Sequence, residues 1–264
     1  LWRFHGRHQP LYHHLNQAMK DYFAGVSDDR MGIEPFADVV WPRISLGNLS
    51  SYDFFALDEM ILHAFYWRNR RRYTSFFDVG AHIGIDTLLA AVLGYEVVAF
   101  EPDPENFRLM NDILLFNGCS AVESYCKGIS DNAGSVEFVR VKGNTTANHI
   151  SGARDFYGDH ESFTVETMTF ADLGRFPELM KINVEGHETV VVGTIPLPVW
   201  DAMDAFIEIH DEENRDNIFA HFEGSGVNVF AQRLGWRKAR SAADMPATNK
   251  EGYVFVSRRQ RMPW

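Results

Sequence analysis

The chain has 264 residues, of which 45% are hydrophobic and 23% charged, so global disorder is excluded and one large domain or a domain with an extension is expected. It carries 25 basic and 36 acidic residues, a net charge of −11, which argues against a general nucleic-acid binder. Two cysteines exclude a disulfide scaffold and a four-cysteine zinc site, and we interpret Cys119 and Cys126 as reduced thiols. Because no apolar run approaches the ~18 residues of a membrane-spanning helix, we expect no membrane span and a cytoplasmic location.

Residues 1–50 differ from the rest in being rich in histidine, aromatic residues and proline. Apolar residues at helical spacing predict a helix over residues 11–23, which Gly25 ends, and a second helix over residues 53–70. We therefore divide the chain into an N-terminal helical extension, residues 1–50, and a main domain, residues 51–264. We expect the N-terminal helices either to cover the functional site or to form a homodimer contact.

From residue 75 onward, strands and helices alternate. The patterns predict strands at 76–79, 96–100, 121–125, 136–141, 179–184 and 204–209, helices at 83–93, 104–117, 188–193 and 216–224, and a closing antiparallel pair at 227–233 and 253–257. This alternation predicts an α/β fold with an open, mainly parallel, doubly wound sheet and helices on both faces. Segment 144–163 lacks periodicity, and we expect a loop there that is either a lid or a plain surface excursion.

The strongest local signal is a strand that runs into a turn with two glycines and then into a helix, with the sequence DVGAHIG over residues 78–84. Glycines let the backbone approach a ligand closely, and a helix N-terminus offers unpaired N–H groups to an anion. We therefore expect these residues to bind a cofactor: Asp78, Gly80, Ala81, His82 and Gly84.

A second signal is the acidic residue Glu101 at the end of the next predicted strand, seventeen positions after Gly84. In βαβ nucleoside sites an acidic residue at this place accepts hydrogen bonds from the ribose hydroxyls. The predicted cofactor site also includes Pro102 and Asp103, which follow directly. We expect the adenine to lie beside Pro102, Phe107 and residues 124–127.

The spacing favours one cofactor over another. A nicotinamide site shows G-x-G-x-x-G, whereas this turn reads G-x-x-x-G and carries Asp78 two residues before the first glycine. A carboxylate at that strand end is poorly placed for a pyrophosphate, but it suits the ammonium and sulfonium groups of S-adenosylmethionine (SAM). The sequence therefore predicts SAM, with a dinucleotide and a plain tight turn as the alternatives.

Three segments together, DVGAHIG at 78–84, AFEPDP at 99–104 and KINVEGHE at 181–188, resemble the FkbM-type SAM-dependent methyltransferases. The resemblance covers about residues 75–210. It implies the class I methyltransferase fold, a Rossmann-like seven-stranded sheet whose last strand is antiparallel. It also implies SAM as methyl donor and, usually, a hydroxyl acceptor on a sugar, a glycan or a natural product. The chain departs from the family pattern at Asn183, where Asp is usual, and at His82, where Asn is frequent.

An alcohol is a weak nucleophile at neutral pH, so a base or a metal has to assist the loss of its proton. The candidate bases are His187 and His210, each at the end of a predicted strand, and Glu185 is a candidate for orienting the acceptor. A structural hydrogen bond is the alternative role for each. Glu185, His210 and Asp211 carry metal-ligating atoms, but no tight metal-binding spacing is present, so we predict no metal and a solvated charge run at Asp211.

These observations predict SAM-dependent O-methylation of a hydroxyl on a small molecule or glycan, with no nucleic-acid partner. The alternatives are N-methylation, a dinucleotide-linked oxidoreductase, and a degenerate SAM-binding partner protein without activity. Asn183 suggests the last of these, because it removes a negative charge beside the expected reaction centre.

Overall fold

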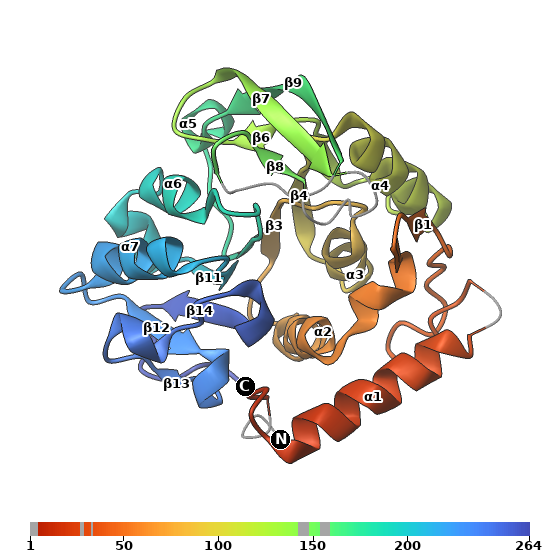
Figure 1. Ribbon diagram of the computed structural model, residues 1–264, viewed down its shortest axis with the longest axis horizontal. Coiled ribbons are helices and arrows are strands. Elements are labelled where there is room, and N and C mark those ends of the chain that lie inside the picture. Colours follow the sequence, from red (N-terminus) through yellow and green to blue (C-terminus); the bar gives the residue numbers. More distant parts are fainter. Residues whose placement is uncertain (1–4, 27–28, 33, 142–147, 154–158) are drawn as a thin grey trace.

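The computed structural model describes residues 5–26, 29–32, 34–141, 148–153 and 159–264, and an eight-stranded sheet runs through it (Figure 1). In order across the sheet, the strands are β13 (Arg237–Lys238), β12 (Asn228–Ala231), β14 (Tyr253–Ser257), β11 (Asp204–Glu208), β10 (Leu179–Ile182), β3 (Ser75–Val79), β4 (Glu96–Phe100) and β5 (Glu123–Tyr125). Strands β11, β10, β3, β4 and β5 are parallel, and β14 is antiparallel to both of its neighbours. The predicted mainly parallel sheet and antiparallel last strand are confirmed. The count is eight rather than seven because the two-residue strand β13 lengthens one edge.

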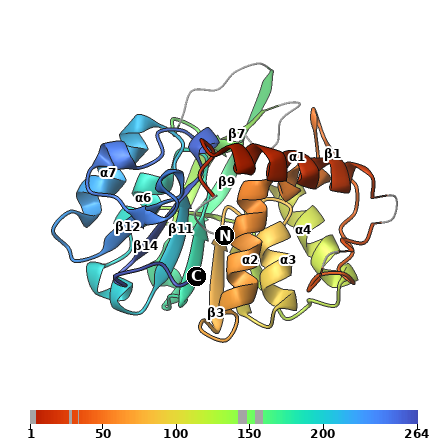
Figure 2. The same ribbon diagram turned by 90° about the horizontal axis from the view of Figure 1, so that it is seen from below.

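Helices cover both faces of this sheet (Figure 2). One face carries α2 (Leu57–Asn69), α3 (Ile85–Val92) and α4 (Pro104–Phe116), and the other carries α5 (Phe170–Leu173), α6 (Glu188–Gly193) and α7 (Glu212–Phe222). Adjacent residues of β3 show why: Phe76 packs on Tyr66 of α2, whereas Phe77 joins the cluster under α6 and α7. Side chains alternate between the faces of a strand, so a strand that is apolar throughout has to be covered twice. The doubly wound prediction is confirmed.

The N-terminal residues pack on the same face as α3 and α4. They form α1 (Pro10–Ala24), the pair β1 (Ser45–Leu46) and β2 (Leu49–Ser50), and the short helix η2 (Ser51–Phe55). Phe23 of α1 stacks on Phe55 with ring centroids 4.2 Å apart, and both belong to a hydrophobic cluster that includes Leu88 of α3. The predicted helix over residues 11–23 is confirmed, and Gly25 caps it.

The helix predicted over residues 53–70 is confirmed from Leu57 to Asn69, but its predicted start is wrong, because the chain is extended at Ala56, with ψ 156°. Ser50 and Asp53 form a capping box that begins η2, and the acidic residues Asp58 and Glu59 then begin α2 as a separate helix. Further one-turn helices are η4 (Leu197–Asp201), η5 (Gln232–Leu234), η6 (Ala242–Asp244) and η7 (Asn249–Glu251). Within the described ranges, no helix combines the length and apolar character needed to cross a bilayer.

A second, four-stranded sheet has the order β6 (Gly128–Ile129), β9 (His160–Met168), β7 (Gly134–Val141) and β8 (His149–Ile150). Strand β7 pairs with β9 from Gly134↔Thr167 to Val141↔His160. The loop predicted for segment 144–163 is therefore wrong at β8 and from His160 onward, while residues 144–147 and 154–158 lie outside the described residues. Strands β8 and β9 form by pairing with β7, so the periodicity of their own sequence did not predict them.

Candidate functional site

A cavity of about 240 Å³ opens beyond the carboxyl ends of β3, β4, β10 and β11, where ligands bind in open α/β sheets. We call one part of it the loop end, lined by Gly80, Ala81, His82, Glu101, Pro102 and Ile150. We call the other the carboxylate end, lined by Glu59, Asn183, Glu185, His187 and Glu208. The cavity therefore brings together most residues of the predicted cofactor site and two of the three predicted catalytic residues.

Close packing explains the two glycines of the β3–α3 turn. Gly80 has φ +85°, and a Cβ atom there would lie 1.8 Å from the carbonyl oxygen of Asn183. Gly84 has the same φ, and its Cβ would lie 2.4 Å from Cγ of Met110 in α4. Any side chain at these positions would push the turn away from β10 and α4. The glycines thus fix the position of the cavity wall.

The backbone amides of this turn are already paired. Gly80 and Ala81 both donate to the carbonyl oxygen of Phe100 at 3.0 Å, and His82 donates to Oε2 of Glu101 at 2.8 Å. The expectation that unpaired amides at these residues hold an anion is therefore wrong, because the end of β4 takes them. His82 has φ +53°, and its ring contacts Phe54 with centroids 5.3 Å apart.

Glu101 lies at the end of β4 and is 5% exposed. Its carboxylate accepts hydrogen bonds from the amides of His82 and Asp103 at 2.8 and 2.9 Å, one on each oxygen. Burial raises the pKa of Glu101 to about 8, although both amides act in the opposite direction. Each oxygen keeps a second lone pair, so the ionised carboxylate can still accept hydrogen bonds from a diol.

The structure places Asp78 in a buried ion network behind the cavity. The carboxylate is fully buried, and its Oδ2 accepts a hydrogen bond from Thr87 Oγ1 at 2.6 Å. Nζ of Lys181 lies 3.9 Å from Asp78 Oδ1 and 2.7 Å from Asp86 Oδ2. Burial raises the pKa of Asp78 to about 6. Burial also acts to lower the pKa of Lys181, but the neighbouring carboxylates of Asp86 and Asp78 outweigh burial and raise the pKa of Lys181 overall. These contacts hold the end of β3 against β10 and α3.

Asp103, the last predicted cofactor residue, holds the second sheet in place. Nε and Nη2 of Arg140 donate to its two oxygens at 2.8 and 2.6 Å, and Nδ2 of Asn148 donates at 3.0 Å. Asp103 also caps α4 by accepting from the amide of Glu105. Its carboxylate therefore joins α4 to β7 and positions the cavity wall rather than facing a ligand.

The sequence interpretation missed part of the loop end. Phe138 of β7 and Ile150 of β8 line it, and so do Gly128 and Ile129, which lie just beyond the predicted segment 124–127. Pro102 lies on the wall as predicted. The alternation of residues 134–141 indicated the strand β7, but only its tertiary position shows that this strand reaches the cavity.

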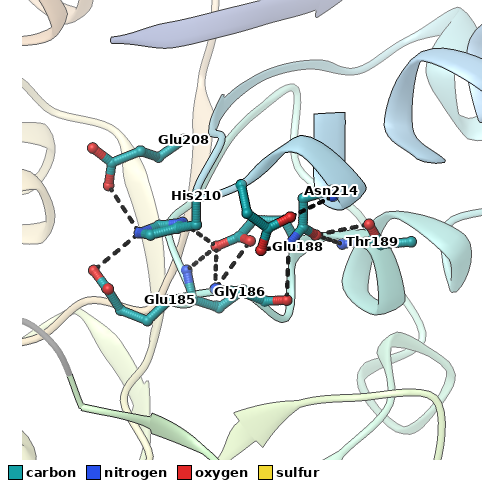
Figure 3. A network of polar contacts seen from close by, with 9 residues as sticks. Glu185, Gly186, Glu188, Thr189, Glu208, His210 and Asn214 are labelled. Atoms are coloured by element: carbon teal, nitrogen blue, oxygen red, sulfur yellow. Dashed lines mark hydrogen bonds and ion pairs between the residues drawn. The ribbon is translucent and has the colours of Figure 1, made fainter. Parts of the chain in front are cut away.

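At the carboxylate end, three glutamates surround one imidazole (Figure 3). Nδ1 of His210 lies 2.9 Å from Oε1 of Glu188, and Nε2 lies 3.2 Å from Glu185 and 3.7 Å from Glu208. Glu188 is fully buried and accepts hydrogen bonds from two backbone amides of the turn after β10. Burial raises the pKa of Glu208 to about 7. Asp211 does not join this group, because it caps α7 through the amide of Asn214 at 2.7 Å.

The two candidate bases differ in the direction of their pKa shifts. Burial lowers the pKa of His210, but the carboxylates of Glu188 and Glu185 outweigh it and raise that pKa well above its usual value. A ring that holds its proton more tightly than usual is a poor base. Burial lowers the pKa of His187, so that ring is neutral at pH 7, and its Nε2 lies 3.1 Å from Oγ of Ser130. Of the two, the direction of the pKa shift favours His187 as the candidate base.

Comparison with known proteins gives the family. Residues 78–238 match the methyltransferase FkbM domain. Similar solved structures include precorrin-6y C5,15-methyltransferase from Geobacter metallireducens GS-15, with 12% identity over 74% of this chain and 85% of that chain and a TM-score of 0.39. An rRNA methylase from Streptococcus thermophilus has 13% identity over 76% of this chain and 95% of that chain, with a TM-score of 0.40. No curated protein matches. Because the matched domain spans more than half of the chain, the protein belongs to the FkbM methyltransferase family.

Proposed function

We propose that this protein transfers the methyl group of SAM to a hydroxyl group of a sugar, a glycan or a small natural product. The observation that carries the proposal is that Glu101 and His187 both line one cavity. Glu101 offers carboxylate oxygens to a ribose diol at the loop end, and His187 offers a neutral imidazole to an acceptor hydroxyl at the other end.

The loop end fits the adenosine half of SAM. Pro102, Phe138 and Ile150 provide apolar walls for a base, and Glu101 lies at the end of β4 to accept from the ribose. The turn at Gly80 and Ala81 then leads to the carboxylate end, whose negative side chains attract the cationic methionine half. When bound, SAM supplies an electrophilic methyl carbon.

The carboxylate end fits a hydroxylated acceptor. Asn183 lines the cavity, and its Oδ1 is buried without a hydrogen bond among the described residues. A buried acceptor atom of this kind favours a ligand that donates a hydrogen bond to it. We assign Asn183 and Glu185 to orienting the acceptor hydroxyl and His187 to removing its proton, which is the contribution the protein makes to an in-line displacement.

The test uses SAM with a deuterated methyl group, together with a panel of methyl glycosides and a panel of primary amines. We expect label only in methyl ethers, located by mass spectrometry and NMR. Label on nitrogen would replace O-methylation with N-methylation. Binding of SAM without transfer to any hydroxylated compound would favour a non-catalytic SAM-binding protein.

A further inference from the structure

The carboxylate end gathers three carboxylates around one histidine. Glu185, Glu188 and Glu208 all lie within 4 Å of the ring of His210. Every side chain of this group is at least 85% buried. Buried carboxylates and an imidazole that converge on one place form a donor set typical of metal sites, so this arrangement favours a bound cation.

His210 is fixed so that one nitrogen faces two of the carboxylates. Glu188 lies behind the ring at Nδ1, and the backbone amides of Val184 and Gly186 hold Glu188 in place. Glu185 and Glu208 approach Nε2 from two sides in Figure 3. The side chain of His210 is 4% exposed, yet Nε2 has no hydrogen bond of normal geometry with any residue in the described part of the chain.

We propose that Glu185, Glu208 and His210 bind one divalent transition-metal cation, with Glu188 as the positioning residue behind the histidine. Binding of the ion displaces the proton of His210 Nε2 to solvent, because a ligating imidazole has to be neutral. The three ligand atoms lie within 4.8 Å of one another. Around an ion with metal–ligand bonds of about 2.1 Å, neighbouring ligand atoms lie about 3 Å apart, so small side-chain movements close the site. A carboxylate behind a ligating histidine fixes its tautomer and orientation in known metal sites.

The ligand set indicates the type of ion. Imidazole combined with carboxylates suits Mn²⁺, Fe²⁺ or Zn²⁺, whereas Ca²⁺ and Mg²⁺ prefer oxygen ligands alone. Glu185 and Glu208 line the cavity, so an ion held by them would be within reach of a molecule bound there. An ion there would lower the pKa of a bound hydroxyl. The metal site is inferred from these side chains alone, so it can be tested separately from methyl transfer.

Backbone strain supports a functional role for this turn. Glu185 has φ +53°, which is uncommon for a residue with a side chain, and Gly186 follows with φ +104°. This reversal after β10 brings the carboxylate of Glu185 to the histidine that follows β11. Strained residues persist at sites whose geometry is used, and binding an ion is such a use.

A second group with metal-ligating atoms, formed by Glu59, His63 and Asp86, serves as an internal comparison. There Lys181 already lies 2.7 Å from Asp86, and Tyr253 donates to Glu59 at 2.8 Å. Its carboxylates therefore have partners within the chain. We expect an added ion to bind at the His210 group and not at the His63 group.

The test titrates the chelator-treated protein with Mn²⁺ and follows the electron paramagnetic resonance signal of the free ion. We expect one bound ion per chain, loss of binding in His210→Asn and Glu208→Gln, and binding weakened about 10- to 100-fold in Glu188→Gln. His63→Asn should bind as the wild type does. Absence of binding to the wild type, or unchanged binding in His210→Asn, would overturn the proposal. Loss of binding in His63→Asn alone would assign the ion to the other group.

Two further measurements guard against misfolded variants. Pulsed electron paramagnetic resonance of the wild-type Mn²⁺ complex should detect coupling of the ion to one imidazole nitrogen. A site made of carboxylates alone would lack this coupling. Without metal, Glu208→Gln should melt at a higher temperature than the wild type, because the substitution removes one crowded carboxylate. Added Mn²⁺ should then raise the melting temperature of the wild type but not that of Glu208→Gln. Equal stabilisation of both proteins would contradict the proposed ligand set.

Discussion

The two ends of the cavity are built in opposite ways. At the loop end two carboxylates are paired within the chain: Glu101 on the cavity wall accepts from two amides, and Asp103 next to it is held by Arg140 and Asn148. At the carboxylate end, Glu185 and Glu208 converge on one buried nitrogen of His210 that lacks a hydrogen bond of normal geometry among the described residues. The loop end is thus shaped before a ligand arrives, whereas the carboxylate end is left to be completed by what binds there.

The difference between the two ends matches two tasks, which are holding the cofactor and carrying out the reaction. A rigid, internally paired wall suits a part of the cofactor that only has to be held. An end with clustered carboxylates and a residue in the left-handed backbone region suits a place where charge changes during a reaction, and the rest of the fold has to stabilise it.

The largest effect is expected from Lys181→Met, which removes the cation of the buried ion network around Asp78. Lys181 lies between Asp86 and Asp78, whose side chains are 1% exposed, and its loss leaves two buried carboxylates without their partner. We expect the free energy of unfolding to fall by about 3–5 kcal/mol, measured by urea denaturation. Lys127→Met is the matched control, because its ion pair with Glu166 is exposed and is expected to contribute less than about 1 kcal/mol. Equal losses in the two variants would mean that burial does not set the strength of these pairs.

A Gly80→Ala substitution should destabilise the protein more than a substitution of a glycine that has free space around it. Its Cβ would lie 1.8 Å from the carbonyl oxygen of Asn183, at φ +85°, so the turn has to move away from β10. We expect a loss of about 3 kcal/mol in thermal unfolding. Gly94→Ala has φ +88° and nothing within 4 Å of its Cβ, so it measures the backbone strain alone and should cost about 1–2 kcal/mol. If the two variants are equally stable, close approach is not the reason for glycine at position 80.

His187→Ala should affect turnover and leave cofactor binding nearly unchanged. His187 lines the carboxylate end with a neutral ring, so its loss removes the proposed base and not the adenosine site. With an acceptor found by the labelling assay, we expect kcat to fall about 100-fold. The affinity for S-adenosylhomocysteine, measured by calorimetry, should stay close to that of the wild type. An unchanged kcat would remove His187 from the mechanism.

Glu101→Gln should weaken cofactor binding about tenfold, in a manner that depends on pH. Burial raises the pKa of Glu101 to about 8, so the proton is bound more tightly in the folded chain than in the unfolded one. The proton bound to Glu101 therefore contributes to the stability of the folded chain below about pH 4.5, and this contribution is lost as the pH rises through about 8. Over the same range, the ionised carboxylate becomes the better acceptor for a ribose diol.

The measurement compares the affinity for S-adenosylhomocysteine between pH 6 and 9 in the wild type and in Glu101→Gln. We expect the ratio of the two affinities to grow with pH, since the ligand titrates identically in both experiments. A constant ratio would mean that ionisation of Glu101 does not contribute to binding.

The sequence predicted the parts of the site that local signals encode. The strand, glycine turn and helix around Gly80, and the position of Glu101 at the end of β4, follow from short-range patterns that the structure reproduces. The roles of Asp78 and Asp103 were not predictable in this way, because their partners Lys181 and Arg140 lie far along the chain. The same holds for the carboxylates around His210, which only the packing of β10 against β11 brings together.

The central claim is that the cavity binds an adenosyl cofactor, and calorimetric titration of the wild-type protein with S-adenosylhomocysteine tests it most directly. We predict one S-adenosylhomocysteine bound per chain and no binding of NAD⁺ under the same conditions. No heat of binding with S-adenosylhomocysteine, or saturable binding of NAD⁺, would contradict the account.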